Sequence, residues 1–146
     1  MHTAVTAHPT AAWTAQQFRE AFPWEQAPRY LIRDRDRAFQ TISATVSAMG
    51  IEEVLTAPRS PWQNAYAERF IGSVRRECLD HVIVLSAAGL RTILKSYVGY
   101  YMTSRTHLSL DKDSPDPRPA TPRASGRVIA IPQVGGLHHR YQRRAA

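Results

Sequence analysis

Apolar residues recur at helical spacing in two segments of the first half of the chain. The first segment begins after Thr10, a residue type that often caps helices, and ends at Pro23; its apolar positions are Trp13, Phe18, Ala21 and Phe22. The second segment ends at Gly50, a residue type that closes helices in a left-handed conformation; its apolar positions are Phe39, Ile42, Val46 and Met49. We therefore expect a helix in each segment.

Short apolar stretches of the kind found in strands alternate with these helices. RYLIR at 29–33 follows Pro28 and predicts a buried strand, and IEEVLT at 51–56 predicts a second strand. PRSPWQN at 58–64 is punctuated by two prolines and predicts a loop. The order helix, strand, helix, strand indicates an α/β fold in which helices pack on a sheet.

Two longer helices are predicted in the second half of the chain. One begins near Gln63, and its apolar side carries Ala67, Phe70, Ile71, Val74 and Cys78. On that side, Cys78 is best interpreted as a small buried thiol of the core rather than a catalytic residue. The other helix begins near Ser86, and its core-facing residues are Leu90, Ile93, Leu94, Tyr97, Val98 and Tyr101.

The composition changes after residue 110. Residues 111–123, DKDSPDPRPATPR, contain four prolines and predict an extended linker. RVIAIPQVGGLHHRY at 127–141 predicts two short strands about a Gly135-Gly136 turn, a hairpin too small to fold alone. We therefore expect a main part at 1–110 and, at 111–146, a Pro-rich basic tail with a short β-hairpin.

The length and overall composition fit one domain without a membrane segment. The chain has 146 residues, and no apolar run approaches the roughly 18 residues that a membrane span needs. The first residues lack the pattern of a secretory signal. The single cysteine rules out an internal disulfide and favours a reducing compartment. These features predict a cytoplasmic location.

The charge of the chain favours polyanionic partners, above all nucleic acid. Its formal net charge is +7 and its pI is near 10.2, and basic residues gain affinity for DNA by releasing the counterions of phosphates. Charge alone is a weak indication of DNA binding, but its distribution adds to it. No acidic residue follows Asp116, whereas the arginines beyond it are Arg118, Arg123, Arg127, Arg140, Arg143 and Arg144.

Two acidic residues stand where a metal site is chemically reasonable. Asp34 directly follows the strand at 29–33, and Glu68 lies in the first turn of the helix that begins near Gln63. Chemistry on DNA phosphodiesters commonly uses two divalent cations, and magnesium accepts carboxylate oxygens from separate elements. Asp36, two residues after Asp34, is a competing ligand.

These acids also have structural interpretations. Asp34 and Asp36 could balance the charges of the neighbouring arginines, which are Arg33, Arg35 and Arg37. Glu68 could stabilise the positive end of the helix dipole. On a helical wheel of about 100° per residue, Arg75 lies about 20° from Glu68, with Gly72 close by. Arg75 could therefore contact a phosphate or neutralise the glutamate.

Two segments together resemble the catalytic core of DDE transposases and retroviral-type integrases, as found in bacterial insertion sequences. They are LIRDRDRAF at 31–39 and SPWQNAYAERFIGSVRRECLDH at 60–81. In that family an aspartate closes a strand and a glutamate follows in a pattern like S-P-x-x-N-x-x-x-E. Asp34 and Glu68 match these acids, with 33 residues between them. YYMTSRTHLSL also resembles the family's R-x-H-x-x-L element through Arg105, His107 and Leu110.

The resemblance implies an RNase H-like fold, a mixed sheet flanked by helices, in which three acids bind two Mg²⁺ or Mn²⁺ ions. Water or a DNA 3′ hydroxyl then attacks a phosphodiester in line. Asp34 and Glu68 would be catalytic metal ligands. DNA would be contacted by residues of the loop and helix around the glutamate, which are Asn64, Arg69, Arg75 and Arg76. The family usually acts as a multimer on paired DNA ends, so a homo-oligomer is expected.

The chain departs from the family pattern at its first acid. The family's first catalytic aspartate lies on an early strand, but no aspartate precedes Asp34. Glu20, within a helix, and Glu25, in a Pro-flanked turn, are poor substitutes, and Asp36 stands where the family often has glycine. We therefore expect an N-terminally truncated transposase, a partial RNase H-like fold without its first strands. It would bind DNA, bind metal weakly and be inactive alone.

Two other functions stay open. One is a non-enzymatic basic DNA-binding remnant, whose DNA binding would depend on salt and not on metal. The other is a complete RNase H-like nuclease, which would need a further acid. Among the histidines, His107 is expected to be a hydrogen-bonding residue rather than a metal ligand, and His138 and His139 are expected to belong to the basic tail.

Overall fold

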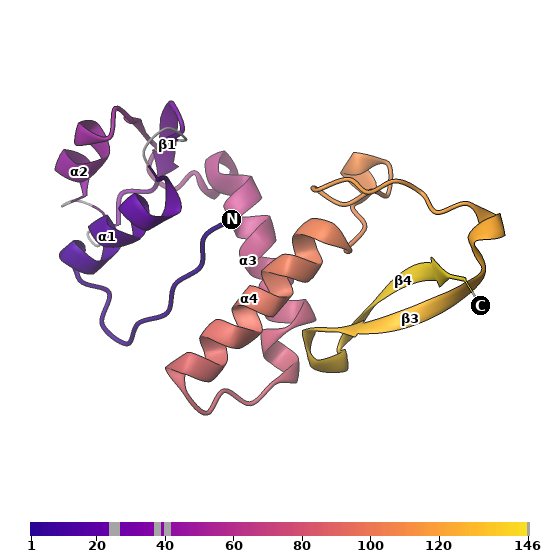
Figure 1. The fold of residues 1–146 in the computed structure, drawn as a ribbon. Helices are drawn as coiled ribbons and strands as arrows, with labels where there is room; N and C mark the ends of the chain where they lie inside the picture. Colours follow the sequence, from indigo (N-terminus) through magenta and orange to yellow (C-terminus); the bar gives the residue numbers. More distant parts are fainter. Residues whose placement is uncertain (24–26, 37–38, 40–41, 146) are drawn as a thin grey trace. The chain divides into compact units, whose positions relative to one another are not determined.

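The computed structural model describes residues 1–23, 27–36, 39 and 42–145. It has mixed α/β structure and divides into two compact units, Met1–Gly72 and Ser73–Ala146. Figure 1 shows the helices and strands of both units. The functional division expected at residue 110 follows from sequence composition and stays a prediction. No helix in the described residues is long and apolar enough to cross a membrane.

A two-stranded parallel sheet organises the first unit. β1 (Tyr30–Arg33) pairs with β2 (Glu52–Leu55), with Tyr30 opposite Glu52 and Arg33 opposite Leu55. Parallel strands need a crossover connection, and α2 (Ser43–Ala48) lies within it. α1 (Ala11–Ala21) precedes the sheet and contacts α2 (Figure 1). The predicted order helix, strand, helix, strand is confirmed.

The core of the first unit is built from the stripe predicted around α2. Ile42, Val46 and Ile51 are buried, and the partly buried residues packed on them are Phe18, Leu31, Phe39 and Met49. Gly50 has a φ of +72°, as expected of a residue that ends a helix in the left-handed region. α2 is shorter than the stripe, because helical geometry begins only at Ser43.

The sheet of the first unit is less buried than the sequence predicts. Leu31 packs on the core, but Tyr30 and Ile32, on the opposite face of β1, are 46% and 52% exposed. Val54 of β2 is 41% exposed. The prediction of a buried strand at 29–33 is therefore wrong, because only one face of the sheet is covered within the described part of this unit.

The loop after β2 leads directly into a long helix. Residues 61–64, predicted as loop, form a 3₁₀ turn that continues into α3 (Ala65–Glu77). The buried residues of α3 are Ser73 and Val74, and Cys78 follows its end with no exposed surface. The prediction of a buried Cys78 is confirmed. Ile71, placed on the same apolar side by its spacing, is instead 52% exposed.

The second unit combines a helix with a β-hairpin. α4 (Ala87–Thr103) is capped by Ser86, whose hydroxyl accepts the N–H of Gly89 at 3.0 Å. β3 (Arg127–Gln133) and β4 (His138–Arg144) are antiparallel, and β3 and the turn between the strands contact α4 (Figure 1). Tyr97 of α4 is fully buried. The predicted helix and hairpin are confirmed.

The Pro-rich segment between α4 and β3 is anchored at its beginning. Residues 111–122 form no helix or strand, as expected of a linker. However, the N–H of His107 donates to the carbonyl of Asp113 at 3.0 Å, and Ser114 is buried. The first residues of the segment therefore belong to the packed part of the second unit.

Candidate metal and DNA site

The carboxyl ends of the two parallel strands place Asp34 at one edge of the first unit. Asp34 follows the last residue of β1, and Thr56 follows the last residue of β2. The N–H of Thr56 donates to the carbonyl of Arg33 at 3.0 Å, so both segments leave the sheet side by side. This edge of a parallel sheet is where α/β proteins commonly bind ligands.

Glu68 approaches the same place from α3. The 3₁₀ turn at 61–64 runs into α3, so Asn64 and Glu68, four residues apart, lie on one helical face. Asp34, Asn64 and Glu68 line one pocket of about 230 Å³. The other lining residues are Arg35, Thr56, Ala57, Pro58, Arg59, Ser60 and Pro61. The fold thus brings together two carboxylates that are far apart in the sequence.

Asp36, the competing acid, does not line this pocket. Its backbone N–H donates to Oδ1 of Asp34 at 3.2 Å. Such a side-chain-to-backbone bond is typical of an aspartate in a turn, and it orients the Asp34 carboxylate. Of the two acids, Asp34 is therefore the one that shares a pocket with Glu68.

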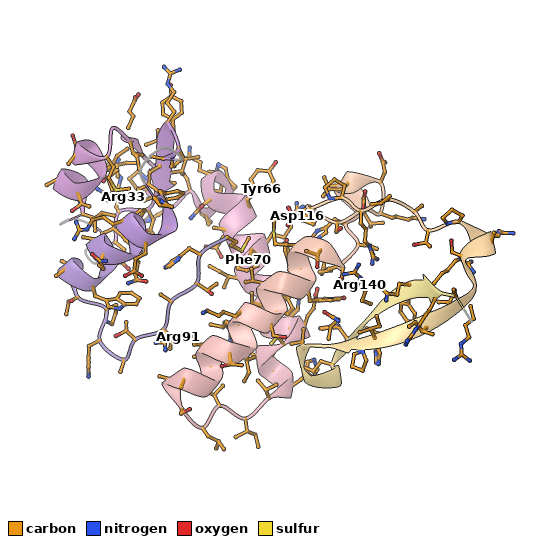
Figure 2. The ribbon with its side chains drawn as sticks, viewed as in Figure 1. Arg33, Tyr66, Phe70, Arg91, Asp116 and Arg140 are labelled. Carbon is orange, nitrogen blue, oxygen red and sulfur yellow. The ribbon has the colours of Figure 1, made fainter. Side chains whose placement is uncertain are left out.

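Arg33 forms its ion pair with Glu53 and not with Asp34. Its Nε and Nη2 donate to the two carboxylate oxygens of Glu53 at 3.2 and 3.1 Å, and the hydroxyl of Ser43 donates to Glu53 at 2.9 Å (Figure 2 labels Arg33). The hydrogen bond from Arg33 lowers the pKa of Glu53. In the described structure Arg33 therefore pairs with Glu53 rather than with Asp34. Arg37 lies outside the described residues.

Two arginines that the sequence patterns did not assign also line the pocket. Arg35 donates from Nε to the carbonyl of Thr56 at 3.1 Å and so joins the segments that follow β1 and β2. Arg59, in the loop after β2, has a φ of +58°. The sequence shows Arg35 next to Asp34 and Arg59 between the two loop prolines. That both arginines line one pocket depends on the parallel pairing of β1 and β2, which the sequence does not show.

The arginines expected to bind DNA are exposed on α3. Arg69, Arg75 and Arg76 have exposed side chains, but none of them lines the pocket. Two aromatic residues one helical turn apart, Trp62 and Tyr66, are 70% and 88% exposed (Figure 2 labels Tyr66). The structure therefore presents Arg69 and two aromatic side chains to solvent near Glu68, whereas Arg75 and Arg76 are exposed in the last turn of α3.

The pocket residues fit a hard divalent cation in part. Carboxylate oxygens of Asp34 and Glu68, and the amide oxygen of Asn64, are ligand types that Mg²⁺ and Mn²⁺ accept. However, the described residues contain no group of three or more His, Cys, Asp or Glu that could hold a metal ion. Glu20 is hydrogen-bonded to Gln16 on α1, and Glu25 lies outside the described residues. The described pocket residues therefore suit such a cation in the type of ligand but supply fewer acids than the three that the family uses.

The residues of the R-x-H-x-x-L element form a hydrogen-bonded cluster in the second unit. Arg105 donates from Nε and Nη2 to the two carboxylate oxygens of Glu77, at 2.7 and 2.6 Å. The hydroxyl of Tyr97 donates to the same carboxylate at 2.9 Å. The hydrogen bonds from Arg105 hold the pKa of Glu77 below its usual range, whereas burial, aided by Glu77, raises the pKa of Tyr97. Arg105 therefore forms an ion pair with Glu77 inside the second unit.

His107 and His138 also join this cluster. Arg105 lies 3.3 Å from Nδ1 of His107, which must accept because a guanidinium only donates. The hydrogen-bonding role predicted for His107 is confirmed. His138 donates from Nε2 to the carbonyl of Glu77 at 2.7 Å and stacks on Tyr100, with ring centroids 4.4 Å apart. His138 thus lies in the tail, as expected, and the hairpin also brings it to the end of α3.

Comparison with known proteins agrees with the resemblance of the motifs. Residues 49–115, which include Glu68 and Arg105, match the family model of the integrase core domain, a family whose fold is RNase H-like. An uncharacterised 39.2 kDa protein of insertion element IS476 from Xanthomonas euvesicatoria is 29% identical over 131 residues. The alignment covers 88% of this chain but only 38% of that protein. Residues 49–115 are therefore similar to the integrase core domain, and most of the chain is similar to part of an insertion-element protein.

Proposed function

We propose that this chain is part of an insertion-sequence transposase and acts in DNA integration and transposition by metal-dependent phosphodiester strand transfer. The observation that carries the proposal is the pocket shared by Asp34 and Glu68. These two residues match the aspartate and the glutamate of the family's motif. Parallel strand pairing and the first turn of α3 bring them together across 33 residues of sequence.

The chemistry of the pocket supports this role. A divalent cation there would act as a Lewis acid on a DNA phosphodiester. Asp34 and Glu68 would hold it through carboxylate oxygens, with Asn64 beside them. Arg35 and Arg59 would attract the negatively charged phosphate. Exposed arginines of α3, which are Arg69, Arg75 and Arg76, would contact the DNA backbone.

We also propose that the chain alone does not catalyse strand transfer. The family uses three acids, but no aspartate precedes Asp34 in this sequence, and two carboxylates of the described residues line the pocket. The sheet of the first unit also supports a partial RNase H-like core. A sheet of two strands is only marginally stable, and its outer face carries the exposed residues Tyr30, Ile32 and Val54. Geometry for two cations would be incomplete without further ligands.

Metal binding tests the ligand assignment. In titrations of the purified chain with Mn²⁺, followed by calorimetry, we expect Asp34→Asn and Glu68→Gln each to weaken binding by at least about tenfold. Asp36→Asn and Glu52→Gln remove acids that do not line the pocket and should leave the affinity unchanged. Loss of binding in Asp36→Asn, with normal binding in the Asp34 and Glu68 variants, would contradict the assignment.

Activity and DNA binding test the rest of the proposal. With Mg²⁺, a plasmid and an oligonucleotide donor, we expect no strand transfer or nicking by the chain alone. Metal-dependent products that disappear in Asp34→Asn and Glu68→Gln would contradict the proposed inactivity. DNA binding that depends on salt, but is unchanged by Mn²⁺ in a chain that binds no metal, would favour a non-enzymatic DNA-binding remnant.

The proposal extends to assembly and location. Because the family usually acts as a multimer on paired DNA ends, we propose that copies of this chain associate on DNA in the cytoplasm. Light scattering of the chain with and without a DNA duplex should show a complex that contains two or more copies. A single copy per duplex at saturating protein would contradict this part of the proposal.

A further inference from the structure

A second pocket, of about 490 Å³, lies between β4 and the Pro-rich segment of the second unit. Three arginines from two parts of the chain line it: Arg118 comes from the Pro-rich segment, and Arg140 and Arg143 come from β4. Asp113 is the acid in the lining, and Tyr141 and Gln142 are further lining residues. The described lining residues therefore include three arginines and one acidic residue.

Arg140 has an unsatisfied nitrogen. Its Nε is buried and has no hydrogen-bond partner in the part of the chain that the structure describes. A cationic N–H that is shielded from water and lacks an acceptor is costly for a folded protein. The planar guanidinium group of arginine can donate two parallel hydrogen bonds to the oxygen atoms of a phosphate or of a carboxylate. Figure 2 shows Arg140 on the hairpin of β3 and β4.

Asp113, the acid among the described lining residues, does not pair with these arginines. The carboxylate of Asp113 accepts the N–H of Ser114 at 2.8 Å, and within the described residues it forms no ion pair with an arginine. Arg143 donates from Nη1 to the carbonyl of Gly126 at 3.0 Å, which holds its guanidinium near the end of the hairpin. Arg118 is half-buried. The described lining of the pocket therefore carries a net positive charge.

Positive charge continues along the hairpin beyond the pocket. Arg127 of β3 lies directly opposite Arg144 of β4 in the antiparallel register. Like charges in such a cross-strand pair destabilise a sheet unless an anion lies near them. Two separate groups of arginines, one in the pocket and one at the open end of the hairpin, match a ligand with repeated phosphates better than a single free anion.

We propose that the Arg118–Arg140–Arg143 pocket binds a phosphodiester group of DNA. The choice of DNA as the source of the phosphate rests on the proposed function, whereas the anion site itself rests on the pocket and on Arg140. A phosphate with its flanking sugars fits the open volume. The ring of Tyr141, 62% exposed at the same pocket, offers a flat surface to the adjoining nucleotide.

Binding of a fluorescein-labelled DNA duplex to the whole chain, measured by anisotropy over a range of salt concentrations, tests the proposal. Arg118→Gln and Arg140→Gln should each lower the affinity about fivefold and reduce the salt slope by about one. Arg91→Gln is the matched control, because Arg91 is exposed on α4 and does not line the pocket (Figure 2). It should change the affinity less than about twofold.

The outcomes separate this inference from the proposed function. If the wild-type chain does not bind DNA, both fail; if it binds and all three variants behave alike, only the pocket assignment fails. Circular dichroism checks the fold, and if Arg140→Gln is unfolded, Arg118→Gln, which changes a residue outside the hairpin, decides. The Nε–Hε resonance of Arg140 should shift on adding the duplex. A shift with inorganic phosphate at equal ionic strength, but not with DNA, would overturn the assignment to DNA.

Discussion

Arg105 and Glu77, 28 positions apart, form a two-point ion pair in which Nε and Nη2 donate at 2.7 and 2.6 Å to separate carboxylate oxygens. Glu77 is the last residue of α3, and Arg105 follows α4, so the pair joins the ends of two helices. Each side chain is 26% exposed, and water therefore screens the pair in part. Its two-point geometry still makes it specific for arginine.

Replacement of Arg105 by lysine should destabilise the second unit. Lysine keeps the positive charge but cannot donate from two nitrogens in one plane, so one carboxylate oxygen of Glu77 loses its partner. We expect the free energy of unfolding to fall by about 1–2 kcal/mol, as measured by urea denaturation. Lys95→Arg, an exposed change on α4, is the control and should have no effect. Equal stability of Arg105→Lys and wild type would show that the pair contributes little.

The same pair predicts how stability depends on pH. The hydrogen bonds from Arg105 lower the pKa of folded Glu77 below its usual value of 4.5. A lowered folded pKa means that the stabilisation is complete above the unfolded pKa and is lost as the pH falls through the folded pKa. Urea midpoints of the wild type should therefore approach those of Glu77→Gln below about pH 4. A constant difference between the two proteins from pH 7 to acid would contradict this linkage.

Elements determined by local interactions were predictable from the sequence. Thr10 caps α1 by accepting the N–H of Trp13 at 3.2 Å, Ser86 caps α4, and the stripe from Phe39 to Met49 forms the core of the first unit. Exposure was not predictable in the same way. Ile32 has the spacing of a core residue, but spacing does not tell which face of a sheet is covered.

The candidate site was predictable to the extent that its residues stand at the ends of such elements. Asp34 closes a strand and Glu68 lies in a first helical turn, so their sequence positions indicated the pocket, and their roles stay predictions. The partners of Glu77 were not predictable. Arg105 lies 28 positions away and His138 lies 61 positions away, and the packing of α4 and of the hairpin brings them to the end of α3.

Arg35 should position the metal site without binding the metal. Its Nε donates to the carbonyl of Thr56 and fixes the two segments that line the pocket. Arg35→Lys keeps the charge but loses this planar donor, and we expect Mn²⁺ binding to weaken by about tenfold. Arg59→Lys is the control, since Arg59 lines the same pocket without a hydrogen bond in the described structure. Equal Mn²⁺ affinities of the two variants would show that the hydrogen bond from Arg35 to Thr56 does not contribute to metal binding.

Cys78 should report the opening of the second unit. Its side chain has no exposed surface, and burial raises the pKa of its thiol, so attack on a disulfide reagent requires opening of the structure. In Arg105→Lys, a loss of about 1–2 kcal/mol should raise the rate about 5- to 30-fold. Glu53→Gln removes the partner of Arg33 in the first unit and should leave the rate unchanged if the units open separately. An equal increase in both variants would show instead that the two units unfold as one, and reaction of wild-type Cys78 at the rate of a free thiol would contradict its burial.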